Sequence, residues 1–153
     1  MKLTPFHLAV QVRDIEEARD FYGRKMGFPE GRSDEAWIDF DMFGHQFVTH
    51  LNPQIGKEGK VAAIANPVDG HAVPVPHFGV VLAFEDWELL AERVKECISE
   101  FIIDPYVRFQ GQAGEQGTMF FLRSLGQCSR IQGVSRHRVG TVCKIILRTV
   151  PFR

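Results

Sequence analysis

The last fifth of the chain contains no acidic residue. All 19 Asp and Glu lie in residues 1–122 beside 11 Lys and Arg, which gives that part a net charge of −8 (11 minus 19). Residues 123–153 carry seven Lys and Arg and no acid. So abrupt a change within one chain indicates that this segment differs in origin or role from the rest.

The chain also lacks long apolar runs and has few cysteines. No stretch approaches the roughly 18 apolar residues of a membrane span, and MKLTPFHLAV is not a secretory signal. Cys97, Cys128 and Cys143 form neither an even set nor a C-x-x-C pair, which fits a reducing compartment. We therefore expect a cytoplasmic protein without membrane contact. Because the basic excess is confined to the end of the chain, we expect no nucleic-acid partner.

The first 30 residues combine a strand pattern and a helix pattern. In PFHLAVQV, residues 5–12, apolar and polar side chains alternate with the period of two of a half-buried strand, and His7 lies on its polar face. A helix is predicted next, because Asp14 is a good N-cap, Glu17 completes a capping box and Gly27 is a stop signal.

Two further alternating segments, AWIDFDM and HQFVTHL, predict a hairpin that turns at Phe43 and Gly44, with another short strand near residues 28–33. The order then starts again. HFGVVLAF predicts a strand, EDWELLAERVKECISEF a helix capped by Asp86, and PYVRFQ and GTMFFL two more strands. His77 begins the second copy much as His7 begins the first, so we interpret the chain as an internal duplication.

This pattern predicts an α+β protein built from two modules. We assign residues 1–52 to the first module and residues 77–134 to the second. Residues 53–76, rich in Pro and Gly and longer than the roughly 12–15 residues usual for a structureless loop, are interpreted as a linker or a lid. Residues 135–153 form an atypical basic and apolar tail.

Three histidines lie on predicted strands: His7, His50 and His77. Neutral imidazole is the commonest metal ligand in proteins, and imidazoles mounted on sheets can point into a shared concavity. Each histidine taken alone is also compatible with a half-exposed polar strand residue. The equivalent places of His7 and His77 in the two copies favour the metal-ligand interpretation.

The segments FHLAVQVRDIEEARDFYGRKMGF, HFGVVLAFEDWELLAERV and GEQGTMFFL resemble the vicinal oxygen chelate superfamily over residues 4–122. This superfamily includes glyoxalase I, extradiol dioxygenases, fosfomycin-resistance enzymes and bleomycin-binding proteins. The resemblance implies two βαβββ modules whose curved mixed sheets form a cleft. It implies His7 and His77 as metal ligands, with His50 as a third ligand or as a catalytic base beside the metal.

The resemblance also implies a divalent metal, with iron(II) as the first expectation and zinc, nickel or manganese as alternatives. It implies a small substrate with two neighbouring oxygens and a homodimer. Tyr106, Arg108 and Gln110 share one parity on the predicted strand PYVRFQ, so we expect them to bind a substrate oxygen, the alternative being that they face solvent. Trp37 is interpreted as lining the cavity, with core packing as the alternative.

The sequence differs from the superfamily pattern at the last expected metal ligand. In the superfamily a glutamate follows a turn resembling Asp-Pro-Ser-Gly-Asn, whereas this chain reads RSLGQCSRIQG, with Arg130 in the place of the carboxylate. Codons compatible with these residues encode Asp-Pro-Ser-Gly-Asn-Ala-Leu-Glu-Phe-Lys-Gly when read one base later. We therefore hypothesise that the chain is frameshifted from about residue 123, the alternative being a genuine basic arm. Gene codons incompatible with the shifted reading would disprove this.

The sequence thus predicts a metal-dependent enzyme of glyoxalase or extradiol-dioxygenase type. Its metal site is expected to be impaired, because a guanidinium offers no lone pair to a metal. The alternative is a metal-free small-molecule binding protein of bleomycin-resistance type.

Overall fold

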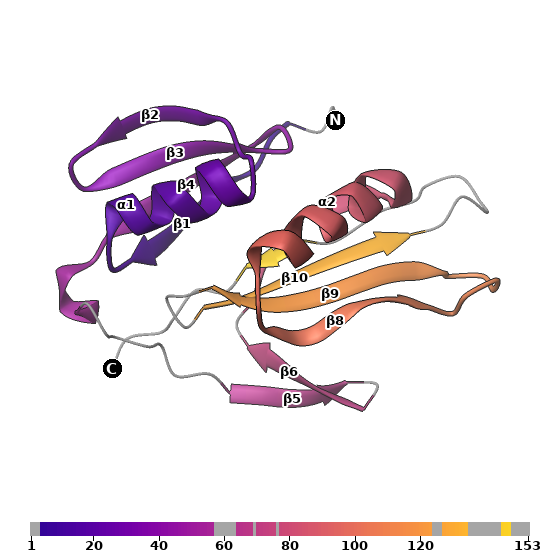
Figure 1. The fold of residues 1–153 in the computed structure, drawn as a ribbon. Coiled ribbons are helices and arrows are strands. Elements are labelled where there is room, and N and C mark those ends of the chain that lie inside the picture. Colours follow the sequence, from indigo (N-terminus) through magenta and orange to yellow (C-terminus); the bar gives the residue numbers. More distant parts are fainter. Residues whose placement is uncertain are drawn as a thin grey trace. The chain divides into compact units, whose positions relative to one another are not determined.

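A computed structural model describes residues 4–56, 64–68, 70–75, 77–123, 127–134 and 145–147. The chain divides into two compact units, Met1–Lys60 and Val61–Arg153. Each unit contains a mixed sheet with a helix packed on it (Figure 1). The α+β class predicted from the sequence is confirmed.

The first unit is one βαβββ module. Its elements in chain order are β1 (His7–Val12), α1 (Ile15–Ala18) continuing as the π-helical segment η1 (Arg19–Lys25), β2 (Glu30–Asp34), β3 (Trp37–Met42), β4 (His45–Leu51) and the 3-10 turn η2 (Pro53–Ile55). The strands are arranged in the order β1-β4-β3-β2. β1 runs parallel to β4, whereas the β4/β3 and β3/β2 pairs are antiparallel.

The N-cap, the stop signal and the hairpin turn predicted in this unit are confirmed. The Asp14 carboxylate accepts a hydrogen bond from the Glu17 backbone N–H at 2.8 Å, and Gly27 follows the helix with a φ of +76°. Phe43 (φ +56°) and Gly44 (φ +84°) form the β3/β4 turn. Positive φ at both central residues is the signature of a type I′ hairpin, whose twist matches that of the strands.

One face of this sheet packs against the helix through aromatic rings. Tyr22, 1% exposed, contacts Phe47 and Phe21 edge to face, with ring centroids 4.7 and 5.0 Å apart. Each such pair contributes about 0.5–1.5 kcal/mol beyond simple burial. Side chains of the opposite parity form what we call the polar face: His7, Gln11, Trp37, Asp39, Asp41, Gln46 and His50, with Ala9 and Val48 between them.

The second unit repeats the βαβββ order. Its elements are the hairpin β5 (Ile64–Val68) and β6 (His71–Val75), then β7 (Val81–Ala83), α2 (Phe84–Cys97), β8 (Phe101–Arg108), β9 (Gln116–Arg123), β10 (Gln127–Val134) and β11 (Ile145–Leu147). The main sheet has the order β11-β10-β9-β8, and β7 also pairs with β10. β7 is parallel to β10, as β1 is to β4.

Two boundaries predicted in this unit are wrong. α2 begins at Phe84 with Ala83 as N-cap, not after Asp86. Glu85 and Asp86 instead occupy the first helical turn, where the positive end of the helix dipole favours acidic side chains. The helix starts at Phe84, and β7 covers only Val81–Ala83, in place of the eight residues of HFGVVLAF.

The predicted strand at residues 105–110 is also displaced. β8 covers Phe101–Arg108, and Phe109 has a φ of +52°. A positive φ interrupts the alternation of side chains, so Gln110 lies in the exposed turn after the strand and does not share a face with Tyr106.

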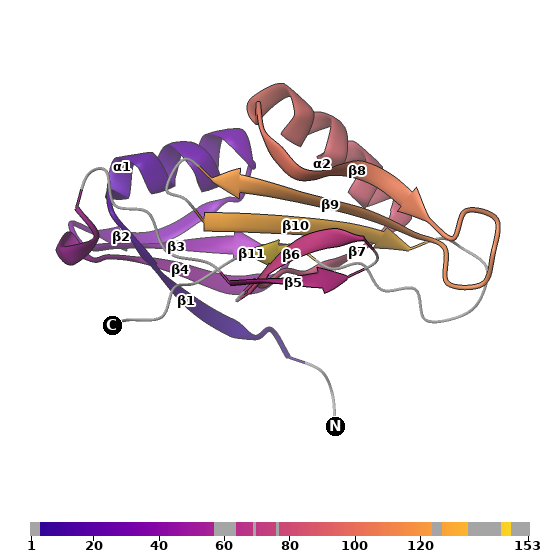
Figure 2. The same cartoon turned by 90° about the horizontal axis from the view of Figure 1, so that it is seen from below.

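Residues 53–76, expected as a linker or lid, contain regular structure. β5 and β6 pair antiparallel, with Ile64 opposite Val75 and Val68 opposite His71. Val73 is buried in a cluster with Ile103 of β8 and Phe120 of β9. In Figures 1 and 2 the hairpin lies on the side of the main sheet away from α2. The hairpin therefore covers part of the sheet face that corresponds to the polar face of the first unit.

No helix within the described residues combines the length and the apolar composition that crossing a lipid bilayer requires.

On the helix side of this sheet, α2 makes an unusually close approach. Its buried residues are Trp87, Leu90, Ala91 and Val94. The Trp87 indole lies directly over Gly117 of β9, where an added Cβ would be only 2.6 Å from the ring. Since Trp87 is 4% exposed and cannot swing into solvent, glycine is required at this position.

We therefore expect Gly117→Ala to destabilise the protein by about 1–3 kcal/mol through overpacking. The matched control is Gly23→Ala, where the new Cβ would meet Phe40 at an ordinary 3.6 Å inside a helix. That change should be neutral or stabilise by about 0.5–1 kcal/mol. Urea denaturation of both variants measures this difference, and equal midpoints would contradict the packing argument.

Candidate functional site

His7 is linked to two other side chains on the polar face of the first unit. It lies opposite Gln46 in the parallel β1/β4 ladder, and its Nδ1 is 2.7 Å from the Gln46 amide oxygen. The Gln46 amide nitrogen donates to the Asp39 carboxylate at 2.9 Å. A chain of hydrogen bonds therefore runs across three strands and holds the His7 ring at one end of the polar face.

His50 lies at the other end of that face. It is opposite Gln11 of β1 and Trp37 of β3 in the two ladders. His7 and His50 are separated by four residues of register, or about 13 Å along the strands at about 3.3 Å per residue. The first unit therefore does not bring His7 and His50 to one metal ion.

Trp37 is half-buried on the polar face, beside His50. The helix-facing residues of β3 are Ile38, Phe40 and Met42, so Trp37 is not part of the core between sheet and helix. The Arg32 guanidinium lies 5.9 Å from the centre of the indole ring, within cation–π range. Trp37, His50 and Arg32 thus offer an aromatic surface and two nitrogen-bearing groups side by side.

A pocket adjoins the His7 chain in the first unit. Its lining includes Asp39 and Gln46 of that chain together with Asp41, Glu30 and the ring of His45. Because its charged lining residues are acidic, this end of the unit disfavours anionic ligands.

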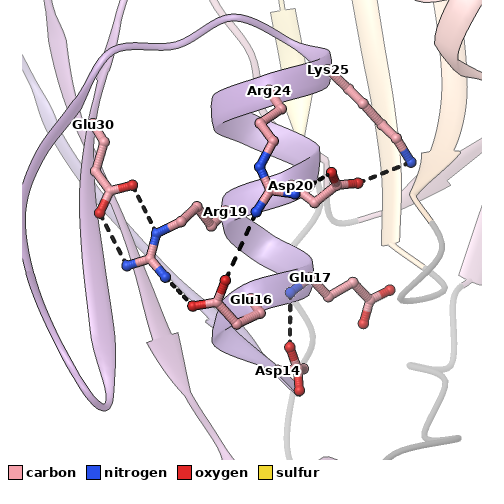
Figure 3. A network of polar contacts seen from close by, with 8 residues as sticks. All are labelled: Asp14, Glu16, Glu17, Arg19, Asp20, Arg24, Lys25 and Glu30. Atoms are coloured by element: carbon pink, nitrogen blue, oxygen red, sulfur yellow. Dashed lines mark hydrogen bonds and ion pairs between the residues drawn. The ribbon is translucent and has the colours of Figure 1, made fainter.

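Glu30 is held by an ion pair to the helix (Figure 3). The Arg19 guanidinium donates to both Glu30 oxygens, at 2.9 and 3.1 Å, and also contacts Glu16. Hydrogen bonding by Arg19 keeps the pKa of Glu30 below its ordinary value, and the same bond raises the pKa of Arg19. On the other side of the helix, a hydrogen bond from Lys25 lowers the pKa of Asp20. Charge pairs thus fasten the helix and β2 beside the pocket.

His77 contacts the main sheet of the second unit. Its ring lies 5.8 Å from the ring of Phe120, edge to face. Phe120 is directly opposite Arg130 in the antiparallel β9/β10 ladder. His77 and backbone position 130 are therefore neighbours of the same residue.

Tyr106, Arg108 and Gln110, which were predicted to bind substrate from one strand, lie in different surroundings. Tyr106 packs against the cluster that contains Phe120, and its ring is 5.7 Å from that of His71 on β6. The Arg108 guanidinium stacks over the Phe109 ring at 5.1 Å, next to the β8/β9 turn. Gln110 lies in that turn. His71 was not predicted, because only the fold of the β5/β6 hairpin brings it to Tyr106.

The donor chemistry fits a divalent metal in part. Within the described residues, no three side chains of His, Cys, Asp or Glu gather closely enough to hold one ion. His7 and His77 belong to different units. Imidazole suits zinc, nickel and iron, but position 130 carries a cation where a carboxylate would complete the set.

A comparison with known families decides the classification. The family model described as the glyoxalase/bleomycin resistance protein/dioxygenase superfamily matches residues 4–121. The chain belongs to this superfamily. The resemblance drawn from the sequence is confirmed, and the match ends two residues before the acid-free segment begins.

Solved structures of superfamily members share the fold. A glyoxalase/bleomycin resistance protein/dioxygenase from Alicyclobacillus acidocaldarius is 28% identical, with a TM-score of 0.63, over 86% of this chain and 92% of that chain. A genomically encoded fosfomycin resistance protein, FosX, from Listeria monocytogenes is 15% identical, with a TM-score of 0.55, over 88% and 96% of the two chains. The second likeness shows the fold alone. No curated protein sequence matches the chain.

The Arg19–Glu30 pair predicts a pH-dependent contribution to stability. Because the pKa of Glu30 is lowered from 4.5 in the folded protein, the pair stabilises fully above that value, and its contribution is lost as the pH falls further. Glu30→Gln should cost about 0.2–1 kcal/mol at neutral pH and progressively less in acid.

Urea denaturation at neutral pH and at about pH 3 measures this loss. Glu35→Gln, on the adjacent exposed turn, is the matched control and should change stability at neither pH. A Glu30→Gln cost that stays constant with pH would contradict the ion-pair explanation.

Proposed function

We propose that this superfamily member is a metal-dependent enzyme of glyoxalase or extradiol-dioxygenase type, with His7 and His77 as metal ligands. Superfamily membership supports a small-molecule ligand of the vicinal-oxygen type. The observation that carries the enzyme proposal is that a histidine lies near the start of each module: His7 begins β1, and His77 lies four residues before β7. Each precedes the helix of a βαβββ module whose first strand is parallel to its last.

A divalent ion held by these imidazoles would supply Lewis-acid chemistry toward a substrate with two neighbouring oxygens. Iron(II) is our first expectation, and zinc, nickel or manganese are the alternatives. Around it, Tyr106 offers a hydroxyl and Arg108 offers donors from the end of β8, whereas Gln110 lies in the turn that follows the strand. His50 is proposed as the base that moves a substrate proton, with Trp37 as the adjoining surface.

His50 is assigned to the substrate and not to the metal because of the sheet register. Its separation from His7 along the polar face leaves it outside a site centred on that residue. A base four residues further along the sheet can still contact a bound substrate.

Arg130 is the reason to expect an impaired site. It has no lone pair for a metal, and a fixed positive charge beside a divalent cation is repulsive. The chain as written therefore has two imidazoles and lacks the carboxylate that would complete a facial set of ligands.

A metal-free binding protein is the second candidate. Arg130 favours this candidate. An arginine in place of the glutamate ligand weakens metal binding, whereas a metal-free protein binds its organic ligand without that carboxylate. The similarity to proteins described as bleomycin or fosfomycin resistance proteins is compatible with it.

The proposal includes an oligomeric state and a cellular compartment for this chain. Superfamily members often form dimers, and we propose a homodimer for this chain, in the cytoplasm that its cysteine content indicates.

Metal analysis tests the proposal. The purified full chain is loaded with iron(II), zinc or nickel, desalted, and its metal content measured. We expect about one metal ion per chain or less, rising in Arg130→Glu, because a carboxylate is restored beside His77. His7→Ala and His77→Ala should each abolish binding.

His45→Ala is the matched control. His45 stacks on Phe6 at 4.1 Å and is engaged through Nδ1 by the Phe6 backbone N–H, so its loss should leave the metal content unchanged. If neither the wild type nor Arg130→Glu holds metal, the enzyme proposal is wrong and the metal-free binder is favoured.

A further inference from the structure

We infer that Gln46 and Asp39 are positioning residues for His7, because together they determine which nitrogen of its ring carries the proton. The inference rests on the proposed function of His7 as a ligand. It deepens that proposal by assigning roles to two residues that the sequence pattern did not single out.

The direction of the hydrogen-bond chain follows from its carboxylate end. Ionised Asp39 only accepts hydrogen bonds, so Gln46 turns its amide nitrogen toward Asp39 and donates at 2.9 Å. The amide oxygen of Gln46 then faces His7, 2.7 Å from Nδ1. An acceptor at that distance requires a proton on Nδ1. In the neutral ring, Nε2 therefore carries the free lone pair.

The sheet register holds the three residues in this order. His7 pairs with Gln46, Gln46 pairs with Asp41, and Asp39 lies two residues further along β3 on the same face. A group that accepts from one ring nitrogen of a histidine commonly fixes the orientation of the other nitrogen toward a metal. Gln46 is placed to do this for His7.

His45 provides an internal contrast. Its Nδ1 accepts the backbone N–H of Phe6 at 3.2 Å, so the neutral His45 ring carries its proton on Nε2. His7 and His45 are thus expected to be opposite tautomers within one unit.

The experiment is nitrogen-15 NMR of the histidine rings in the metal-free full chain, at a pH well above the ordinary imidazole pKa of about 6.5. We expect His7 protonated on Nδ1 and His45 on Nε2. Gln46→Leu and Asp39→Ala should shift His7 toward the Nε2-protonated form. Gln11→Leu, on the same face but bonded to Asn52, should not. A wild-type His7 protonated on Nε2, or a tautomer unchanged by Gln46→Leu, would overturn the inference.

Zinc titration separates this inference from the proposed function. Gln46→Leu should weaken zinc binding at His7 by about 10- to 100-fold, and Gln46→Glu, which still accepts from Nδ1, should restore it. If the tautomers are as expected but the wild type binds no zinc, the positioning stands and the metal function is wrong.

A second inference comes from β10 and is independent of any metal. We propose that β11 competes with the residues preceding β7 for one edge of β10. β10 pairs with β9 along all eight of its residues, which occupies one edge completely. β7 pairs with Gln132–Val134 and β11 with Ser129–Ile131. These two strands therefore share the remaining edge, end to end.

The first unit shows how far the equivalent pairing extends when nothing competes for it. There β1 pairs with β4 over six residues and includes His7. Continuing the β7/β10 register toward the N-terminus would place residues 78–80 opposite Ser129–Ile131, and His77 opposite Cys128. Those three positions of β10 are the ones that β11 occupies.

Two strands cannot use the same backbone donors and acceptors at once. Occupation by β11 therefore limits β7 to three residues and keeps His77 out of the strand. Release of β11 would let β7 extend and give His77 the strand position that His7 has in β1. The tail strand thus acts as a switch for the geometry of the second module.

Hydrogen exchange of backbone amides tests this competition in the full chain. Ile146→Pro removes a backbone donor from β11 and should displace it, so the amides of residues 78–80 should exchange at least about tenfold more slowly. Ile146→Val keeps the strand and is the control. Unchanged or faster exchange at residues 78–80 in Ile146→Pro would overturn the proposal.

A second variant, Gly79→Pro, distinguishes competition between the strands from a general loss of structure in Ile146→Pro. Gly79→Pro blocks extension of β7 and leaves β11 without a competitor. Exchange at residues 145–147 should then slow, whereas exchange that is unchanged or faster would contradict competition for one edge.

Discussion

The parallel pairing of the first strand of each module with its last strand is the constraint on which the rest depends. Parallel strands cannot be joined by a tight turn, so a helix and two strands lie between them in the chain. The pairing brings the start of the first strand beside the last strand. It sets His7 against Gln46 in the first unit, and in the second unit it sets Val81–Ala83 against Gln132–Val134.

Local chemistry made much of the fold predictable. Asp14, Glu17 and Gly27 define the first helix, and Phe43 with Gly44 defines a hairpin, because caps and turns depend on residues close in sequence. The limits of β7 and β8 were not predictable in this way. The first depends on which strand occupies β10, and the second on a positive φ at Phe109, a residue type that rarely adopts one.

The residues of the candidate site were also predictable only in part. His7 and His77 were predicted from the internal repeat, which a sequence shows directly. Gln46, Asp39 and His71 were not, since their roles follow from which residues lie opposite one another across strands. The alternation of side chains predicts the face of a strand but not its register. The same limit made His50 look like a partner of His7, although four residues of register separate them.

β2 has a consequence for how this chain meets other chains. β2 is an edge strand of the first sheet, and all five of its residues are exposed. The charges of Glu30, Arg32 and Asp34 alternate along it. A strand added there would have to strip water from these charges and disturb the Arg19–Glu30 pair, which discourages edge-to-edge aggregation. At the opposite edge of the sheet, β1 carries His7 and Gln11 but no Asp, Glu, Lys or Arg. Any intermolecular strand pairing by this sheet is thus directed to the edge that carries His7.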